Sequence, residues 1–161
     1  MITQELLKTL FNYNPDTGLF TRLTRPSPNV SAGDIAGYKQ YGYVIVMIAN
    51  KSYKAHRLAW LYIHGEWPEE HIDHLNGVRC DNRLANLRQA TNTQNSCNRK
   101  ISATNKSGLK GVFWRRDRSV WRAAITVNGK QKVLGTFKCK HEAHSAYCHA
   151  ADKYHKEFAH Y

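Results

Sequence analysis

Hydrophobic positions near the N-terminus follow first a helical and then a strand spacing. Apolar side chains recur at helical intervals over residues 4–11, and the composition of residues 14–18 predicts a turn. Residues 34–55 are rich in aromatic and β-branched side chains, which favours strands, and residues 49–52 suit a hairpin turn. The N-terminal part is therefore predicted to be β-rich after one short helix.

The middle of the chain returns to helical spacing and then becomes polar. An apolar stripe predicts a helix over residues 56–64. Residues 70–74 are predicted to form a short extended segment. Residues 82–88 are expected to form a turn, and residues 91–98 a helix.

The last third of the chain begins with a polar segment without periodicity, residues 99–106, which is typical of a linker. Asn128-Gly129 predicts a tight hairpin inside the module that follows. Three strands and one helix are predicted there, at residues 109–115, 120–127, 131–137 and 140–156.

Alternation along the middle strand of this module predicts a buried and an exposed face. The apolar face carries Trp121, Ala123, Ile125 and Val127. The other face carries Arg122, Ala124 and Thr126. Alanines at helical spacing let the following helix lie close against the sheet. Trp114 is assigned to the core, with stacking on the sugar-phosphate of DNA as the alternative.

The net charge of +12 is concentrated near the C-terminus. Residues 101–161 hold twelve Lys and Arg against four Asp and Glu, whereas residues 56–100 hold six against five. Such an excess predicts a polyanionic partner, and its position predicts that the last third supplies most of the attraction.

The four cysteines have no CxxC spacing, so no structural zinc site is expected, and the thiols are expected to be reduced. The chain has no apolar run of membrane-spanning length, and its first residues lack the pattern of a signal peptide. These features predict a soluble, cytoplasmic protein that has no membrane partner and would act in the host cell cytoplasm if phage-encoded.

The candidate chemistry lies around Asp73-His74. Hydrolysis of a phosphodiester needs a base for water, neutralisation of charge on phosphorus, and stabilisation of the leaving oxygen. A His with a near-neutral pKa can serve as the base, and a hard divalent cation on oxygen ligands can do the rest. His71 and His74 alone are too few ligands for a zinc site.

Several blocks fall in the order of the HNH endonucleases of the ββα-metal class: His56-Arg57-Leu58, Asp73-His74, Asn76-Gly77, Asp81-Asn82-Arg83, Asn86-Leu87-Arg88 and Asn95. Over residues 10–98 the chain resembles the phage-type members, which include homing endonucleases. The resemblance implies Mg²⁺ or Mn²⁺, a 5′-phosphate product and double-stranded DNA as substrate.

Roles carried over by position follow from this resemblance. His74 is the implied general base, Asp73 and Asn95 the implied metal ligands, and Asn86 the residue that holds the His74 ring. His56 is assigned a structural role at the start of a packed helix. Candidate phosphate contacts in this part of the chain are Arg57, Arg83 and Arg88.

The C-terminal module resembles an AP2 domain, through Gly108-Leu109-Lys110-Gly111-Val112, Trp121-Arg122-Ala123-Ala124-Ile125 and Leu134-Gly135-Thr136-Phe137. AP2 domains bind DNA with the exposed face of their sheet. The implied DNA-binding residues are Lys110, Arg115, Arg116, Arg118, Arg122, Thr126, Lys130 and Lys132. At Phe113, Ala124 and Val133 the chain departs from the AP2 domains of plant transcription factors, which tend to have polar, charged or large aromatic contact residues there. The resemblance therefore does not imply the target sequence of the plant proteins.

The predicted fold class is α+β in two modules. A ββα-metal HNH nuclease region with a β-rich N-terminal part spans residues 1–98, with its core motif at 54–98. Residues 99–106 form the linker. Residues 107–161 form an AP2-like three-stranded antiparallel sheet packed on one helix.

The predicted activity is metal-dependent cleavage of DNA by a phage homing-type enzyme, either nicking or cutting both strands. A monomer on DNA is expected to nick, and a dimer could cut both strands. One alternative is a non-enzymatic AP2-type regulator with a decayed nuclease region. A nuclease directed at RNA is a further alternative, although the basic sheet lacks the aromatic pair of an RRM-like platform.

Overall fold

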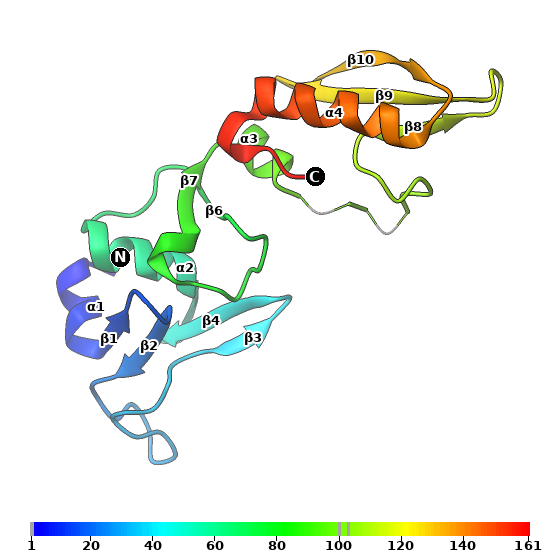
Figure 1. Cartoon of the computed structure of the whole chain (residues 1–161). Helices are drawn as coiled ribbons and strands as arrows, with labels where there is room; N and C mark the ends of the chain where they lie inside the picture. Colours follow the sequence, from blue (N-terminus) through cyan, green and yellow to red (C-terminus); the bar gives the residue numbers. More distant parts are fainter. Residues whose placement is uncertain (1, 100, 103) are drawn as a thin grey trace. The chain divides into compact units, whose positions relative to one another are not determined.

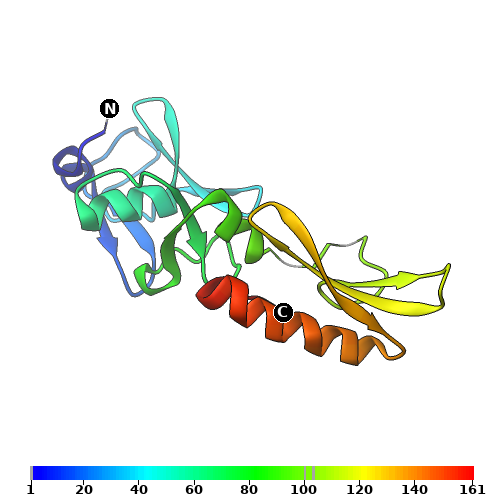
Figure 2. The same ribbon diagram turned by 90° about the horizontal axis from the view of Figure 1, so that it is seen from above.

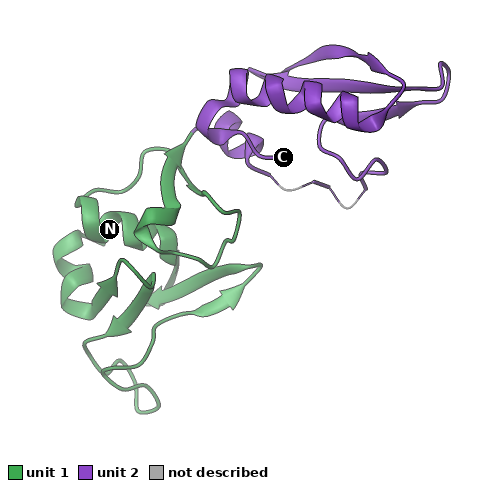
Figure 3. Ribbon diagram, in the orientation of Figure 1, with its two compact units in different colours: residues 1–90 green, residues 91–161 purple. Residues whose placement is uncertain are grey.

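The computed structural model describes residues 2–99, 101–102 and 104–161. The chain divides into two compact units, Met1–Ala90 and Thr91–Tyr161 (Figures 1 and 3). The division falls before the short helix α3 (Asn92–Cys97), whereas the sequence analysis places the module boundary after that segment.

The first unit opens with α1 (Gln4–Leu10), whose N-terminus is capped by the Thr3 hydroxyl accepting from the Leu6 amide. Two antiparallel strands, β1 (Phe11–Asn14) and β2 (Leu19–Arg22), flank the predicted turn. The β-rich segment forms an antiparallel sheet of three strands: β3 (Tyr38–Gln40), β4 (Tyr43–Ile48) and β5 (Lys51–Lys54).

The core of this unit forms around α2 (Ala55–His64), which ends at Gly65 with a left-handed φ of 83°. Fully buried side chains from α1, β2, β4 and α2 meet there: Leu7, Phe20, Val46, Leu58 and Leu61. Burial of these apolar side chains anchors α2 on the strands, and this places the start of α2 beside the candidate site.

A second two-stranded sheet carries the motif residues. It consists of β6 (His71–His74) and β7 (Leu87–Ala90), which pair antiparallel, with a 3₁₀ turn η1 (Leu84–Asn86) before β7. The extended segment predicted at β6 is confirmed, and β7 is a strand that the sequence analysis missed. Leu87 and Ala90 are buried, so burial and pairing with β6 impose an extended conformation on a short segment without a strand pattern.

The second unit contains α3, which begins with a capping box between Thr91 and Gln94. Its antiparallel sheet has the order β10-β9-β8, from β8 (Val112–Arg115), β9 (Val120–Val127) and β10 (Lys130–Phe137). Helix α4 (Lys140–His155) lies along one side of this sheet and continues into η2 (Lys156–Phe158) (Figure 2). The predicted three strands and helix are present.

Close packing of α4 on the sheet depends on small residues. Ala143 and Ala151 are fully buried against β9, as the alanine periodicity predicts. A Cβ on Gly111 would come within 2.0 Å of the Tyr147 ring, so the backbone before β8 needs glycine there. The assignment of Trp114 to the core is wrong, because 46% of its surface is exposed.

Within the described residues, no helix combines the length and the apolar character that crossing a bilayer requires.

Candidate active site

His74 ends strand β6 and is buried, with 5% of its surface exposed. Its Nε2 lies 3.3 Å from Oδ1 of Asn82. In the tautomer that carries its proton on Nε2, the ring donates to Oδ1 of Asn82 and Nδ1 is the basic nitrogen. Burial lowers the pKa of His74, and this outweighs the Asn82 hydrogen bond and the charges of Asp73 and Asp81, which raise it. The ring is therefore neutral at physiological pH and able to accept a proton.

Asn82 is itself fixed by the first hairpin of the chain. The Tyr13 hydroxyl donates to the backbone carbonyl of Asn82 at 2.7 Å. Burial, followed by the negative charge of Asp81, raises the pKa of Tyr13 to about 12, so this hydroxyl keeps its proton. At Gly18 an added Cβ would come within 2.4 Å of the Asn82 backbone. The β1–β2 hairpin thus supports the residue that contacts the candidate base.

Two further rings pack around His74. His56, at the start of α2, lies edge-on to it with ring centroids 5.0 Å apart and planes at 90°, and Tyr43 contacts both histidines. Burial lowers the pKa of His56 to about 3, with smaller contributions from His74, Lys54 and Arg57. His56 is buried as predicted, but it also contacts the ring of the candidate base. Its place in the His56-Arg57-Leu58 block was the available signal.

Asp73 faces Arg88 across the β6–β7 pair, because the two residues are register partners. Nε and Nη2 of Arg88 lie 3.0 and 2.9 Å from Oδ2 of Asp73. The side chains are 6% and 15% exposed, so this is an inward-facing ion pair. Arg88 was expected to contact phosphate, and in this structure its guanidinium binds the candidate metal ligand instead.

Asn86 does not make its expected contact with the His74 ring. Its Oδ1 accepts from the Asn76 amide at 3.0 Å, and its Nδ2 donates to the Asp81 carbonyl at 2.8 Å. Both bonds close the loop between β6 and β7. The contact with the base falls to Asn82 because Asn86 lies in the 3₁₀ turn, where its side chain reaches backbone groups of the loop.

The other two predicted phosphate contacts of this region, Arg83 and Arg57, already have partners within the protein. Arg83 binds Asp81 at 2.6 Å, yet 53% of its side chain remains exposed. That pairing is the main cause that lowers the pKa of Asp81. Arg57 donates to the carbonyls of Pro68 and Glu70 at 3.2 and 3.5 Å and so supports the loop before β6.

Asn95, the second expected metal ligand, lies on α3 in the second unit, so it does not belong to the same compact unit as Asp73. Within the described residues, no group of three or more His, Cys, Asp and Glu side chains is arranged to hold a metal ion. The carboxylate of Asp73 is an oxygen donor of the kind that a hard cation such as Mg²⁺ prefers, and such an ion keeps several waters.

In the second unit, strand register decides which predicted DNA contacts share a face. Arg122 and Thr126 lie on the opposite face of β9 from Ala123 and Ile125, and so on the side of the sheet away from α4, where Ala124 between them is also buried. Lys132 pairs with the buried Ile125 and lies on the α4 side, where its Nζ is 2.5 Å from the Tyr154 hydroxyl. Lys130 falls on the same side as Lys132, so the predicted contacts do not form one surface.

The remaining cations of this unit differ in how they are held. Lys110 is partly buried, donates to the Cys97 carbonyl at 2.7 Å, and burial lowers its pKa. Arg115 binds Asp117 at 2.7 Å. Arg116 and Arg118 are exposed in the turn between β8 and β9.

The sequence matches one protein family over the motif, and it is similar to two viral proteins. Residues 53–97 match the HNH endonuclease family. The chain is 39% identical to Protein 3.8 of Escherichia phage T7 over 82 residues, which are 50% of this chain and 68% of that protein. It is 28% identical over 131 residues to a protein named as an uncharacterized HNH endonuclease of Acanthamoeba polyphaga mimivirus, covering 78% of this chain and 67% of that protein. No solved structure matches.

The site and these matches define the class of the protein. The chain belongs to the HNH endonuclease family. It is a nuclease that hydrolyses DNA, and nucleases of this family generally depend on a divalent metal ion.

Proposed function

We propose that this nuclease uses His74 as its general base, with Asp73 as a ligand of a Mg²⁺ or Mn²⁺ ion. The observation that supports the assignment best is the environment of His74: a buried ring, neutral at physiological pH, and oriented by Asn82. Nδ1 of His74 takes the proton of the attacking water. The bound ion would neutralise charge on the scissile phosphate and the leaving oxygen.

The Asp73–Arg88 pair bears on how the ion would be held. Arg88 orients the carboxylate of Asp73 in a buried position, where an unpaired charge would be costly. Nε and Nη2 of Arg88 both contact Oδ2 of Asp73. Arg88 is therefore assigned the role of orienting a metal ligand.

The second unit is proposed to bind double-stranded DNA in the manner of an AP2 domain. The supporting observations are the three-stranded antiparallel sheet backed by α4, the excess of Lys and Arg in residues 101–161, and Arg122 and Thr126 on the side away from the helix. The whole chain then acts as a phage homing-type nuclease, and a single site of this kind nicks one strand when the protein is a monomer.

A plasmid nicking assay in Mg²⁺ tests the proposed chemistry. His74→Ala should lower the nicking rate by at least about 10²-fold, with DNA affinity nearly unchanged. The matched control is His71→Ala, on the same strand but exposed, which should nick like the wild type. Near-normal nicking by His74→Ala would remove the assignment of the base.

A further inference from the structure

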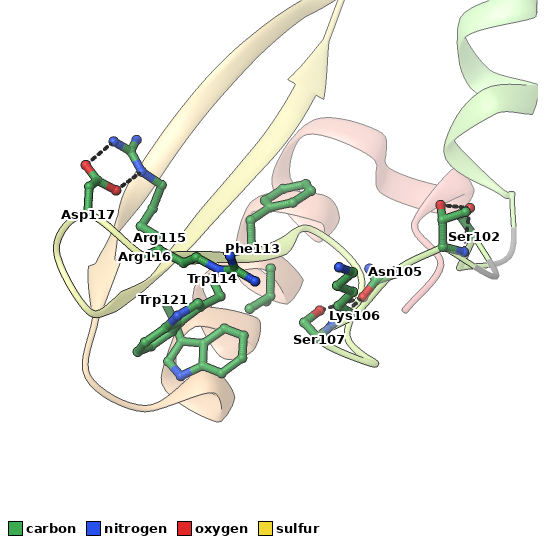
Figure 4. A pocket seen from close by; sticks show the side chains of 12 residues that line it. Ser102, Asn105, Lys106, Ser107, Phe113, Trp114, Arg115, Arg116, Asp117 and Trp121 are labelled. Carbon is green, nitrogen blue, oxygen red and sulfur yellow. Dashed lines mark hydrogen bonds and ion pairs between the residues drawn. The ribbon is translucent and has the colours of Figure 1, made fainter.

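A groove of about 1280 Å³ runs along the free edge of β8 (Figure 4). One wall is β8 with the turn after it, residues 112–117, together with Trp121. The opposite wall is the segment 104–107. Among the residues that the structure describes, β8 pairs only with β9, so its outer edge is open to a ligand that runs along the strand.

Half-exposed aromatic rings line this groove. Phe113 is 48% exposed, close to the value for its neighbour Trp114. The Trp114 ring packs against Trp121 with centroids 4.9 Å apart and planes tilted by 59°, and Trp121 joins the core cluster of Val112. The inner side of the tryptophan pair is therefore anchored while Trp114 still presents ring surface to solvent. An anchored, exposed ring is a platform on which a nucleobase can stack.

The charge of the groove suits a phosphate backbone. Its charged lining residues are Lys106, Arg115, Arg116 and Asp117. Arg115 is bound to Asp117 through Nε at 2.9 Å and Nη2 at 2.7 Å, and the charges of these two residues cancel. The net positive charge of the lining therefore comes from Lys106 and Arg116. Cations beside exposed rings are the combination that binds single-stranded nucleic acid.

The facing wall is held in shape by its own hydrogen bonds. Oδ1 of Asn105 accepts from the Ser107 amide, the Ser107 hydroxyl and the Gly108 amide at 2.8, 2.7 and 3.0 Å. Nδ2 of Asn105 donates to the Leu109 carbonyl at 3.0 Å. The wall is thus formed before any ligand arrives.

We propose that this groove binds single-stranded DNA, with an unpaired base stacked on Trp114 and the adjoining phosphates near Lys106 and Arg116. In a duplex the faces of the bases are already stacked on one another, so a ring such as Trp114 has no base face to contact. A single strand exposes those faces. The inference adds a second form of DNA to the proposed function, and it rests on the assigned DNA partner rather than on the chemistry of His74.

Fluorescence anisotropy of the full chain in EDTA tests the stacking. The probe is a labelled thymidine oligonucleotide of about 12 nucleotides, within the range of single-strand site sizes. Trp114→Ala should weaken its binding by about tenfold or more, and Trp114→Phe should keep most of the affinity because it keeps a ring. Affinity for a duplex of the same length should change far less.

An oligonucleotide of equal length without bases provides a second measure. It keeps the phosphates, so the wild type should bind it about as weakly as Trp114→Ala binds the normal oligonucleotide. Equal binding of the two oligonucleotides by the wild type would overturn the proposal. Unchanged affinity of Trp114→Ala, shown by circular dichroism to be folded, would overturn it too.

The charge component has a matched control within one turn. Lys106→Ala and Arg116→Ala should each weaken the single-strand complex and reduce its salt slope by about 0.7 for each phosphate that the variant no longer neutralises. Arg118→Ala removes the same charge from a side chain that is 74% exposed and outside the groove, so its effect should be smaller. Equal reductions for all three variants would show attraction without a site. These binding measurements are made in EDTA, where no cleavage occurs, so their result is independent of whether His74 is the base.

Discussion

Oδ1 of Asn82 lies 3.3 Å from Nε2 of His74, at the buried end of β6. The Asn82 carbonyl also accepts from Tyr13, so the contact joins the N-terminal hairpin to the candidate base. An asparagine in this position orients the ring and selects its tautomer. This contact identifies Asn82 as a residue whose replacement should affect catalysis without removing any group that reacts.

Replacement of Asn82 tests that role. Asn82→Ala should reduce the single-turnover nicking rate by about 10- to 100-fold, the range seen when partners that orient a reactive side chain are removed. DNA affinity should be retained, because Asn82 is buried. Asn12→Ala, an exposed asparagine on β1, is the control and should be silent. Wild-type rates in folded Asn82→Ala would show that the contact has no catalytic role.

The buried His56 predicts a pH dependence of stability. Its pKa is about 3 in the folded protein against 6.5 for an unperturbed histidine, so the unfolded chain takes up a proton that the folded chain does not bind. The stabilisation that comes from the neutral His56 is complete above the pKa of histidine in the unfolded chain. It is lost as the pH falls from 6.5 toward about 3. Within that window the free energy of unfolding falls by about 1.4 kcal/mol for each pH unit lost, because one proton is taken up on unfolding.

Thermal or urea unfolding at several pH values measures this dependence. His56→Phe keeps a ring and cannot take up the proton, so its unfolding free energy should depend less steeply on pH in the same window. His64→Phe, at the exposed C-terminal end of α2, provides the control. Identical slopes for the wild type and His56→Phe would contradict a buried neutral His56.

The Asp73–Arg88 pair predicts two effects from one substitution. Asp73→Asn should nearly abolish Mg²⁺-dependent nicking, because it removes the anionic ligand. It should also lower stability by about 3–5 kcal/mol, because the buried guanidinium loses its counter-charge. Nicking assays and urea unfolding report the two effects. EDTA should stop nicking by the wild type while DNA binding persists, and activity that survives EDTA would exclude the metal mechanism.

The two sides of the second sheet should contribute unequally to duplex binding. Arg122→Ala removes a cation from the side away from α4, whereas Lys132→Ala removes one that contacts Tyr154 on the α4 side. A phosphate contact of Arg122 would reduce the salt slope by about 0.9. A base contact would instead cost about 1–3 kcal/mol at particular sequences only. Binding titrations over a range of salt should show a larger effect for Arg122→Ala, and equal effects would refute the assignment of the face.

The sequence by itself determined most of the elements. Helices α1, α2, α3 and α4 and the three strands of the second unit follow from periodicity and turn composition. It also indicated Asp73-His74 as the chemical centre, because motif spacing is a property of the chain. β7 was not predictable in this way, since its four residues become a strand through pairing with β6.

Only the tertiary structure decided which side chains meet. The sequence analysis assigned the contact with His74 to Asn86, but the path of the loop between β6 and β7 directs Asn82 to His74 and Asn86 to backbone groups. Arg88 is assigned to Asp73 by register across two strands, and Lys132 to the α4 side by its pairing with Ile125. Such contacts depend on how distant segments pack, and local spacing carries no information about that.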